Sequence, residues 1–145
     1  MQTHFKFIFT IVFIVFVSIL NAQILDVRFI NIRNTKGQLC LAIFADEVGF
    51  KTEKTSWALK CCKKDIMNGE FHIQIPIQEG KWGFSVLDDE NGTGKMEYNL
   101  FGIPRKGFGF SNYFHKGIHK PIFDDFQFCI EKKELKLITV LLKYF

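Results

Sequence analysis

The chain has 145 residues, a formal net charge of +4 and 48% hydrophobic residues, among them 18 phenylalanines. This length suits one domain. The weak positive charge is scattered, so the composition does not indicate a nucleic-acid-binding protein. Even the locally basic stretch 51–64 is best interpreted as a solvent-exposed face.

The first 22 residues have the layout of a secretory signal. Lys6 precedes a strongly apolar run that continues to Leu20, and the small residue Ala22 stands before the expected cleavage point. The run is shorter than the roughly 20 residues that a membrane span needs. We therefore expect a signal peptide over 1–22 and an exported protein, either periplasmic, outer-surface or secreted. If the signal stays uncleaved, it is the expected membrane contact.

The mature chain, 23–145, is predicted to be one all-β domain. Apolar side chains alternate with polar ones in several short stretches separated by turn residues, as in half-buried strands. The first two stretches, joined by a turn at 34–37, are expected to pair as a hairpin, and so are the last two. The expected strands cover 24–33, 38–44, 58–65, 70–77, 81–88, 121–131 and 135–145. About seven such strands and no long helix predict a β-sandwich.

Three further features concern the connections and one strand. The segment 45–57 is expected to be a loop with one helical turn, and Pro76 should mark a strand end or an edge strand. The segment 88–120 is rich in glycine and has no strong period, so it is predicted to be a long loop.

The start of that long loop, DDENGTGKME at 88–97, resembles the beginning of a calcium-binding loop. Oxygen-bearing side chains recur at every second position, and a glycine at the sixth position permits a sharp turn. Such a loop would bind Ca²⁺ through side-chain oxygens and one backbone carbonyl. The candidate ligands are Asp89, Asn91, Thr93, the carbonyl of Lys95, and Glu97.

An EF-hand is excluded, because the twelfth position is Leu100 in place of a bidentate glutamate and no helices flank the loop. Two interpretations stay open. One is a calcium site of another design, with Asp88 or Asn99 as additional ligands. The other is a polar turn held by hydrogen bonds between its side chains and the backbone.

The second half of the long loop, NLFGIPRKGFGFSN at 99–112, combines glycines with large aromatic residues. These aromatic side chains could form an exposed platform for a ligand, a glycan or a partner protein of the envelope. Alternatively, they fold back and cap one end of the sandwich. The candidate residues for a ligand or partner loop are Phe101, Phe108, Phe110, Ser111 and Asn112.

Catalytic patterns are weak. His115 and His119 are four residues apart, but Gly117 between them disfavours a shared helix face for metal binding. Ser111 lies close to His115 in sequence without a nucleophile-elbow motif around it. We therefore expect no enzyme, and a hydrolase is the least favoured function.

Four cysteines lie in the mature part, where export permits disulfides. Adjacent residues on a strand face opposite sides, so Cys61 and Cys62 should not bond to each other. The sequence leaves open whether Cys40 and Cys129 form a bridge or stay as free thiols.

The central segment also resembles a bacterial secreted family, domain of unknown function 2141. That resemblance rests on an aspartate-x-asparagine stretch, a glycine-lysine-leucine-aspartate-like step, a Gly-x-Pro step, a Gly-aromatic-Gly-Phe-Ser-Asn run and a Pro-x-Phe strand. The matching residues here are Asp89, Asn91, Gly94, Lys95, Met96, Glu97, Gly102, Pro104, Gly107, Phe108, Gly109, Phe110, Ser111, Asn112, Pro121 and Phe123. The early segment 34–44 also resembles the family's first hairpin.

The resemblance implies export and an immunoglobulin-like or prealbumin-like sandwich, and it implies no reaction. The family often has histidine where this chain has Asp88, so a role that needs this histidine is not carried over. The favoured hypothesis is thus an exported, non-enzymatic binding module of the envelope, with the 88–112 loop as functional end and Ca²⁺ as its candidate ion. The alternative is a structural or adhesion domain whose loop only caps the sandwich.

Overall fold

The computed structural model describes residues 23–117 and 119–145, so the expected signal peptide at 1–22 lies outside the described residues. These residues are mostly β-structure, with few and short helices, none of which is long and apolar enough to cross a membrane. The described elements are β1 (Gln23–Ile30), β2 (Gln38–Phe44), α2 (Glu47–Lys51), β3 (Trp57–Cys62), a 3-10 turn (Lys63–Asp65), β4 (Phe71–Ile77), β5 (Gly80–Asp89), β6 (Gly107–Phe110), α3 (Phe123–Phe126), β7 (Phe128–Ile130) and β8 (Leu135–Leu141).

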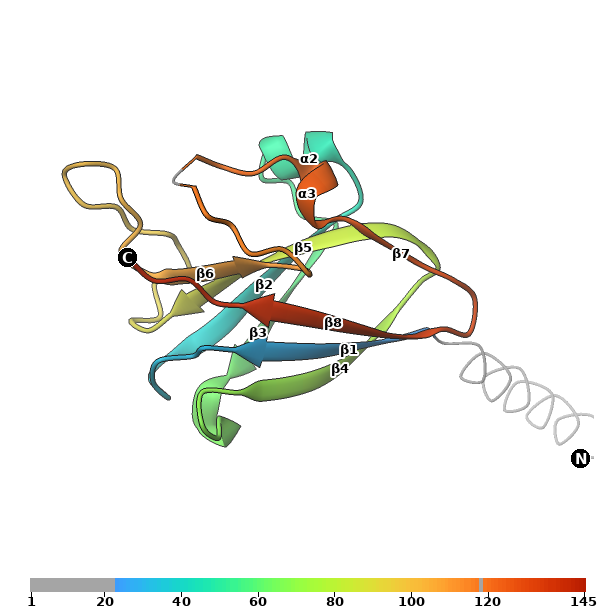
Figure 1. The fold of residues 1–145 in the computed structure, drawn as a ribbon, viewed down its shortest axis with the longest axis horizontal. Helices are drawn as coiled ribbons and strands as arrows, with labels where there is room; N and C mark the ends of the chain where they lie inside the picture. Colours follow the sequence, from blue (N-terminus) through green and yellow to red (C-terminus); the bar gives the residue numbers. More distant parts are fainter. Residues whose placement is uncertain (1–22, 118) are drawn as a thin grey trace, which may run out of the picture.

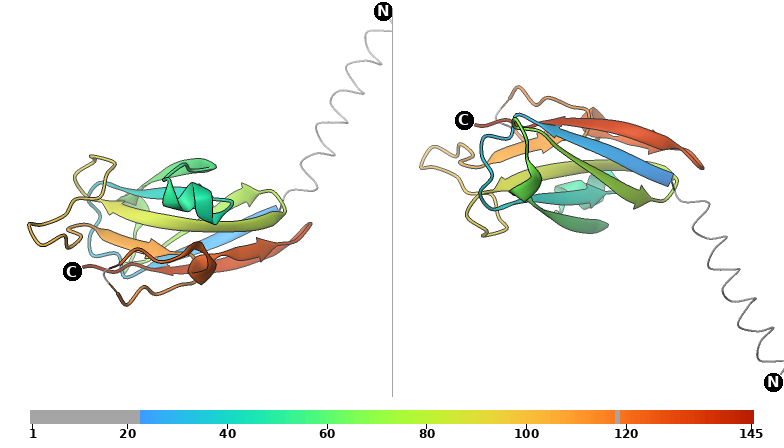
Figure 2. Two further views of the ribbon diagram at one scale, coloured as in Figure 1. Left: turned by 90° about the horizontal axis from the view of Figure 1, so that it is seen from above. Right: turned by 90° about the horizontal axis from the view of Figure 1, so that it is seen from below.

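The strands form two sheets that face each other (Figure 1, Figure 2). The smaller sheet has the order β4-β1-β8, with β1 and β8 parallel. The larger sheet has the order β3-β2-β5-β6, and β7 pairs with the beginning of β5. This arrangement is consistent with the predicted β-sandwich.

Alternation along the strands produces the core between the sheets. In β1, Leu25, Val27 and Phe29 are fully buried, as expected from the sequence, and they meet Leu41 and Phe84 of the larger sheet. Burying a side chain of this size stabilises the fold by about 1.5–3 kcal/mol. This main core is built from side chains between residues 25 and 142, so the region 23–145 encloses a core of its own.

A second cluster of phenylalanines covers part of the outer face of the larger sheet. Phe50 of α2 packs edge-on against Phe126 of α3, with ring centroids 4.8 Å apart. Asp46 caps α2 by accepting a hydrogen bond from the Gly49 N–H, and the Glu47 carboxylate accepts one from the Phe123 N–H. The hydrogen bond between Glu47 and Phe123 joins α2 to α3. The helical turn expected in 45–57 is confirmed as α2.

Both predicted hairpins are wrong. β1 pairs with β4 and β8, whereas β2 pairs with β3 and β5, so the connection 31–37 crosses from one sheet to the other. Near the C-terminus, β7 pairs with β5 and β8 pairs with β1. The alternation of apolar and polar residues correctly identified strands that bury one face. It does not indicate which strands pair with each other, because a strand of this kind can bury its apolar face as a member of either sheet.

Three local assignments also change. The predicted 88–120 loop contains a strand, β6, and its first two residues, Asp88 and Asp89, belong to β5. Asp124 and Asp125, which fall within the expected strand 121–131, lie on the exposed side of α3. The expectation for Pro76 is confirmed, because β4 is the edge of its sheet.

Candidate functional site

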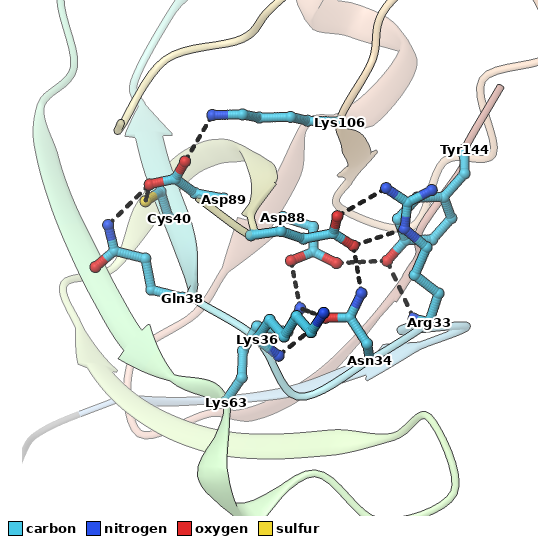
Figure 3. A network of polar contacts seen from close by, with 11 residues as sticks. Arg33, Asn34, Lys36, Gln38, Cys40, Lys63, Asp88, Asp89, Lys106 and Tyr144 are labelled. Atoms are coloured by element: carbon cyan, nitrogen blue, oxygen red, sulfur yellow. Dashed lines mark hydrogen bonds and ion pairs between the residues drawn. The ribbon is translucent and has the colours of Figure 1, made fainter. Parts of the chain in front are cut away.

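Two adjacent carboxylates at the end of β5, Asp88 and Asp89, are fully buried (Figure 3). Because neighbours on a strand point to opposite faces, the two side chains belong to separate clusters. Each cluster contains a buried lysine from a distant part of the chain. Lys63 follows β3, and Lys106 precedes β6.

Asp88 is the centre of the first cluster. Its Oδ1 lies 2.6 Å from the Lys63 ammonium, and its Oδ2 accepts a hydrogen bond of 2.6 Å from the Tyr144 hydroxyl. Lys63 also donates to Asn34 Oδ1 at 3.3 Å. Burial raises the pKa of Tyr144 well above its usual range, and the neighbouring Asp88 charge adds to this effect. The hydroxyl therefore stays protonated and serves as a donor.

An exposed ion pair extends this cluster to the surface. The Arg33 guanidinium binds both carboxylate oxygens of Glu90, at 2.6 and 2.7 Å, and lies 4.6 Å from the centroid of the Tyr144 ring. Asn34 donates to the same carboxylate at 2.7 Å. These contacts join the 31–37 connection, the end of β5 and the C-terminal residues into one network (Figure 3).

Asp89 is the centre of the second cluster. It accepts hydrogen bonds from Lys106 Nζ at 2.7 Å, from Gln38 Nε2 at 2.9 Å and from the Gly94 N–H at 2.8 Å. Burial by itself would raise the pKa of Asp89. The three donors outweigh burial and lower that pKa from 3.8 to about 2. The carboxylate is therefore ionised at neutral pH.

The Lys106 ammonium occupies the centre of the loop predicted to bind calcium. Besides Asp89, it contacts the Thr93 hydroxyl, the Lys95 carbonyl at 2.9 Å and Glu97 Oε1 at 3.2 Å. Burial would lower the pKa of Lys106, but the carboxylates of Asp89 and Glu97 raise it overall. The structure therefore brings four of the five predicted ligands together, around an ammonium group of the chain itself.

The fifth predicted ligand, Asn91, lies at the rim of this cluster. Its amide nitrogen donates to Glu97 Oε1 at 2.8 Å, and its carbonyl oxygen accepts from the Thr93 hydroxyl at 3.2 Å. In the described part of the chain, no group of three or more His, Cys, Asp or Glu side chains is arranged to hold a metal ion.

The predicted ligand-loop residues separate into exposed and buried positions. Phe101 is almost fully exposed at a loop tip, and Phe108 is half-buried. Phe110 is buried in the second phenylalanine cluster, in keeping with the capping interpretation. The Ser111 hydroxyl is fully buried and donates to the Phe126 carbonyl at 2.6 Å, and Asn112 forms two hydrogen bonds with the Thr139 backbone.

A groove of about 520 Å³ lies on the outer face of the larger sheet, beside these loop residues. Its floor follows from the strand register. Ala58 of β3, Ala42 of β2 and Ser85 of β5 are direct cross-strand partners. Three small side chains in one row leave a depression across the centre of the sheet.

The walls of the groove come from segments that rise above the sheet. Phe50 and Pro121 line the groove, and so do Met96, Tyr98 and Pro104 of the long loop. The second row of the floor carries Cys40 between its register partners Lys60 and Leu87. Lys120 also lines the groove, with its ammonium 4.5 Å above the Phe50 ring.

No sequence pattern identified Lys63, Lys106 and Tyr144 as the partners of the two aspartates. Lys63 and Lys106 lie in locally basic sequence and gave no signal for burial. The sequence carries only a weak signal for the groove, namely small residues at outward-facing positions of three predicted strands. The groove could be recognised only once the register placed Ala42, Ala58 and Ser85 side by side.

The remaining candidate residues include His115 and the four cysteines. Both His115 ring nitrogens lack a hydrogen-bond partner among the described residues, and the ring packs against Phe108 and Phe110. All four cysteines are free: Cys62 and Cys129 are exposed, Cys61 is buried and Cys40 is partly buried.

Comparison with known proteins agrees with the resemblance carried by the central segment. No curated protein and no solved structure matches the chain. Residues 27–137 match the family described as uncharacterized proteins conserved in bacteria, DUF2141. The match covers most of the chain and includes both aspartates with their lysines, the long loop and most of the strands. The chain is therefore a member of the DUF2141 family.

Proposed function

We propose that the protein is an exported, non-enzymatic binding module that holds a ligand in the groove on the outer face of its larger sheet. The groove itself carries this proposal. Its volume of about 520 Å³ lies within the range of about 300–1,000 Å³ that is typical of small-molecule sites. The 88–112 segment supplies one wall, which gives the predicted functional loop a physical role.

The lining favours an elongated, largely apolar ligand that carries an anionic group. Phe108 and Leu87 provide apolar surface along the floor, and Tyr98 adds an aromatic ring at one wall. Lys60 has no ion-pair partner among the described residues, so its ammonium is free to meet an anion. Lys120 also lines the groove, but its ammonium is already bound by the Phe50 carbonyl at 3.0 Å and the Glu53 carboxylate at 3.4 Å.

A fluorescent aromatic sulfonate, 8-anilinonaphthalene-1-sulfonate, tests this proposal. We expect saturable fluorescence enhancement that dodecanoate displaces. Ala42→Trp fills the centre of the floor and should weaken dye binding at least about tenfold. Val48→Ser, at an exposed position of α2 outside the groove, is the matched control and should bind like the wild type.

Equal dye affinity in the wild type and in folded Ala42→Trp protein would refute the groove as the site. Displacement by a soluble glycan fragment and not by dodecanoate would replace the apolar ligand with an envelope glycan. Saturable binding should be absent altogether if the domain is purely structural, the alternative in which the loop only caps the sandwich. In that case Asp89→Ala would lower stability only.

The hydrogen bonds and the burial of Ser111, the candidate nucleophile, support the non-enzymatic part of the proposal. The Ser111 hydroxyl donates to the Phe126 carbonyl and accepts from the Phe84 N–H at 3.0 Å. Its oxygen is fully buried, so a substrate could reach it only after the strand end had moved. The Cys40 thiol faces the groove, but burial and the nearby Asp89 charge raise its pKa, which disfavours the reactive thiolate.

We also propose that Lys106, in place of Ca²⁺, supplies the positive charge that orders the 88–97 loop. The four oxygen contacts of its ammonium support this arrangement. It predicts that millimolar Ca²⁺ leaves the melting temperature of the wild type unchanged and releases no heat in calorimetric titration. A rise in melting temperature with Ca²⁺ would favour the calcium-ordered loop instead.

The subtype of the sandwich is a further proposal. An immunoglobulin-like or prealbumin-like topology is supported by the two unequal sheets and by the early crossing of the chain from β1 to β2 in the other sheet. A crystal structure superposed on representatives of both types would test the assignment.

A further inference from the structure

The two most exposed large apolar side chains among the described residues stand next to each other. Leu100 exposes 101% and Phe101 exposes 86% of its reference surface. Tyr98, at 60%, is two residues away. Solvent-exposed clusters of this kind carry a cost in solubility and usually mark an interaction site.

The segment that presents them is ordered by hydrogen bonds. Tyr98 and Pro104 form a bridge, and the Asn99 carbonyl accepts from the Gly102 N–H at 3.0 Å. The Asn99 side-chain oxygen accepts from the N–H groups of Phe101 and Ile103, at 2.9 and 3.0 Å. The segment 97–105 is therefore a small hairpin, called here the apolar tip hairpin, that holds Leu100 and Phe101 outward.

The charges around the tip are positive on balance. Asp88 is paired with Lys63 and Glu90 with Arg33, whereas Asp89 and Glu97 share Lys106, so one negative charge of 88–97 is left over. The exposed side chains of Lys95 and Arg105 flank the hairpin without an ion-pair partner in the described part of the chain. Lys36, in the neighbouring 31–37 connection, is exposed in the same way. This end of the molecule thus presents apolar side chains together with uncompensated positive charge.

We propose that the apolar tip hairpin docks on an anionic lipid surface, with Leu100 and Phe101 entering the interface and Lys95 and Arg105 contacting the headgroups. The exposed tyrosine is suited to the headgroup level, where its ring and its hydroxyl are both accommodated. Basic residues beside an apolar insertion add affinity for anionic lipids. This inference rests on the tip alone and does not depend on a ligand in the groove.

The shape of the molecule favours a bilayer over a folded protein partner. The loops between β5 and β6 project beyond the sheets at the end opposite Gln23 (Figure 1, Figure 2). A projecting tip offers little of the roughly 800 Å² per partner that a stable protein interface buries. Penetration of a lipid interface requires only a few apolar side chains at one point.

Sedimentation with lipid vesicles tests the proposal on the domain 23–145, which encloses its own core. We expect binding to vesicles containing phosphatidylglycerol, weaker binding to pure phosphatidylcholine, and release by high salt. The double variant Leu100→Ser/Phe101→Ser should weaken partitioning at least about tenfold. Lys95→Gln and Arg105→Gln should each weaken it about fivefold on anionic vesicles only.

Leu135→Ser/Leu137→Ser is the matched control, because these two leucines are also exposed but lie on β8, away from the tip. It should bind like the wild type. Absence of wild-type binding to anionic vesicles would overturn the proposal, and so would binding that survives the tip double variant. Association between copies of the chain that is lost in the tip variant, without vesicle binding, would identify a protein surface instead and would also overturn it.

Discussion

Asp88 and Asp89 are two neighbouring carboxylates, both without solvent contact, each paired with its own lysine. Removing such charges from water costs several kcal/mol per ion, and their attraction compensates only when the geometry is good and the other lone pairs are satisfied. Here each aspartate has further donors: Tyr144 for Asp88, and Gln38 and the Gly94 N–H for Asp89. The two pairs therefore fix the end of β5 and the start of the long loop in one arrangement.

Removal of one partner should be far more costly than removal of an exposed charge. Lys63→Met leaves the buried Asp88 carboxylate without its cation, and we expect a loss of about 3–5 kcal/mol in the free energy of unfolding. The matched control is Lys64→Met, at an exposed neighbouring position, where a change within about 0.5 kcal/mol is expected. Urea denaturation at pH 7 measures both. Equal effects of the two substitutions would contradict the buried pair.

The pKa of Asp89 predicts a pH dependence of stability. Its folded-state pKa, about 2, lies below the ordinary value of 3.8, so the ionised carboxylate stabilises the folded state above pH 4. This contribution, about 2 kcal/mol, is lost as the pH falls from about 4 towards 2. Denaturation at pH 5 and pH 2 should show this extra loss in the wild type and a smaller loss in Asp89→Asn. Parallel pH profiles of the two proteins would show that Asp89 is not the titrating group.

At the scale of elements, β6 shows why the long loop was mispredicted. Its sequence, GFGF, alternates with period two, but the inward positions are glycines and give no hydrophobic signal. The structure shows the reason for these glycines. A Cβ on Gly109 would lie 2.5 Å from Val140 Cγ1 of β8. A Cβ on Gly107 would overlap the ring of Tyr144. The absent side chains allow β6 to cross close to the C-terminal strand.

The close approach of β6 to β8 can be tested by substitution of Gly109. Gly109→Ala must displace Val140 or bend β6 away from β8, and we expect a loss of about 1–3 kcal/mol in the free energy of unfolding. Gly117→Ala is the matched control, because its added methyl group meets only ordinary van der Waals contacts at 3.5 Å and its φ is not positive. Thermal denaturation compares the two variants. An unchanged melting temperature in Gly109→Ala would show that the crossing is looser than the structure indicates.

At the scale of the whole molecule, two sheets share one core and the chain passes between them repeatedly. None of the four cysteines is bridged in this topology. The Cys40 side chain lies on the outer face of the larger sheet, beside Leu87, while Cys129 is paired in register with Lys81 at the far end of β5. The fold therefore depends on packing and on the buried ion pairs.

Thiol labelling tests the exposure and the free state of the four cysteines in this fold. In the native protein, iodoacetamide should modify Cys62 and Cys129 rapidly, because both are exposed. Cys61 is buried and the pKa of the Cys40 thiol is raised, so both should react slowly until the protein is unfolded. Mass spectrometry counts the labels, and a reducing agent should leave the melting temperature unchanged. A Cys129 that reacts only after reduction would reveal a disulfide.

The sequence alone determined the β-rich class, most strand positions, the inward faces of β1 and β2, and the family. These properties follow from local alternation and from a motif that is continuous along the chain. It also located the oxygen-rich loop, where Asp89, Thr93, Lys95 and Glu97 converge on a cation.

Only the tertiary structure decided that this cation is the Lys106 ammonium, that β1 and β2 belong to different sheets, and that Ala42, Ala58 and Ser85 form a groove. Strand neighbours and buried charge partners lie far apart along the chain. They are selected by the packing of the whole domain, which local patterns do not encode.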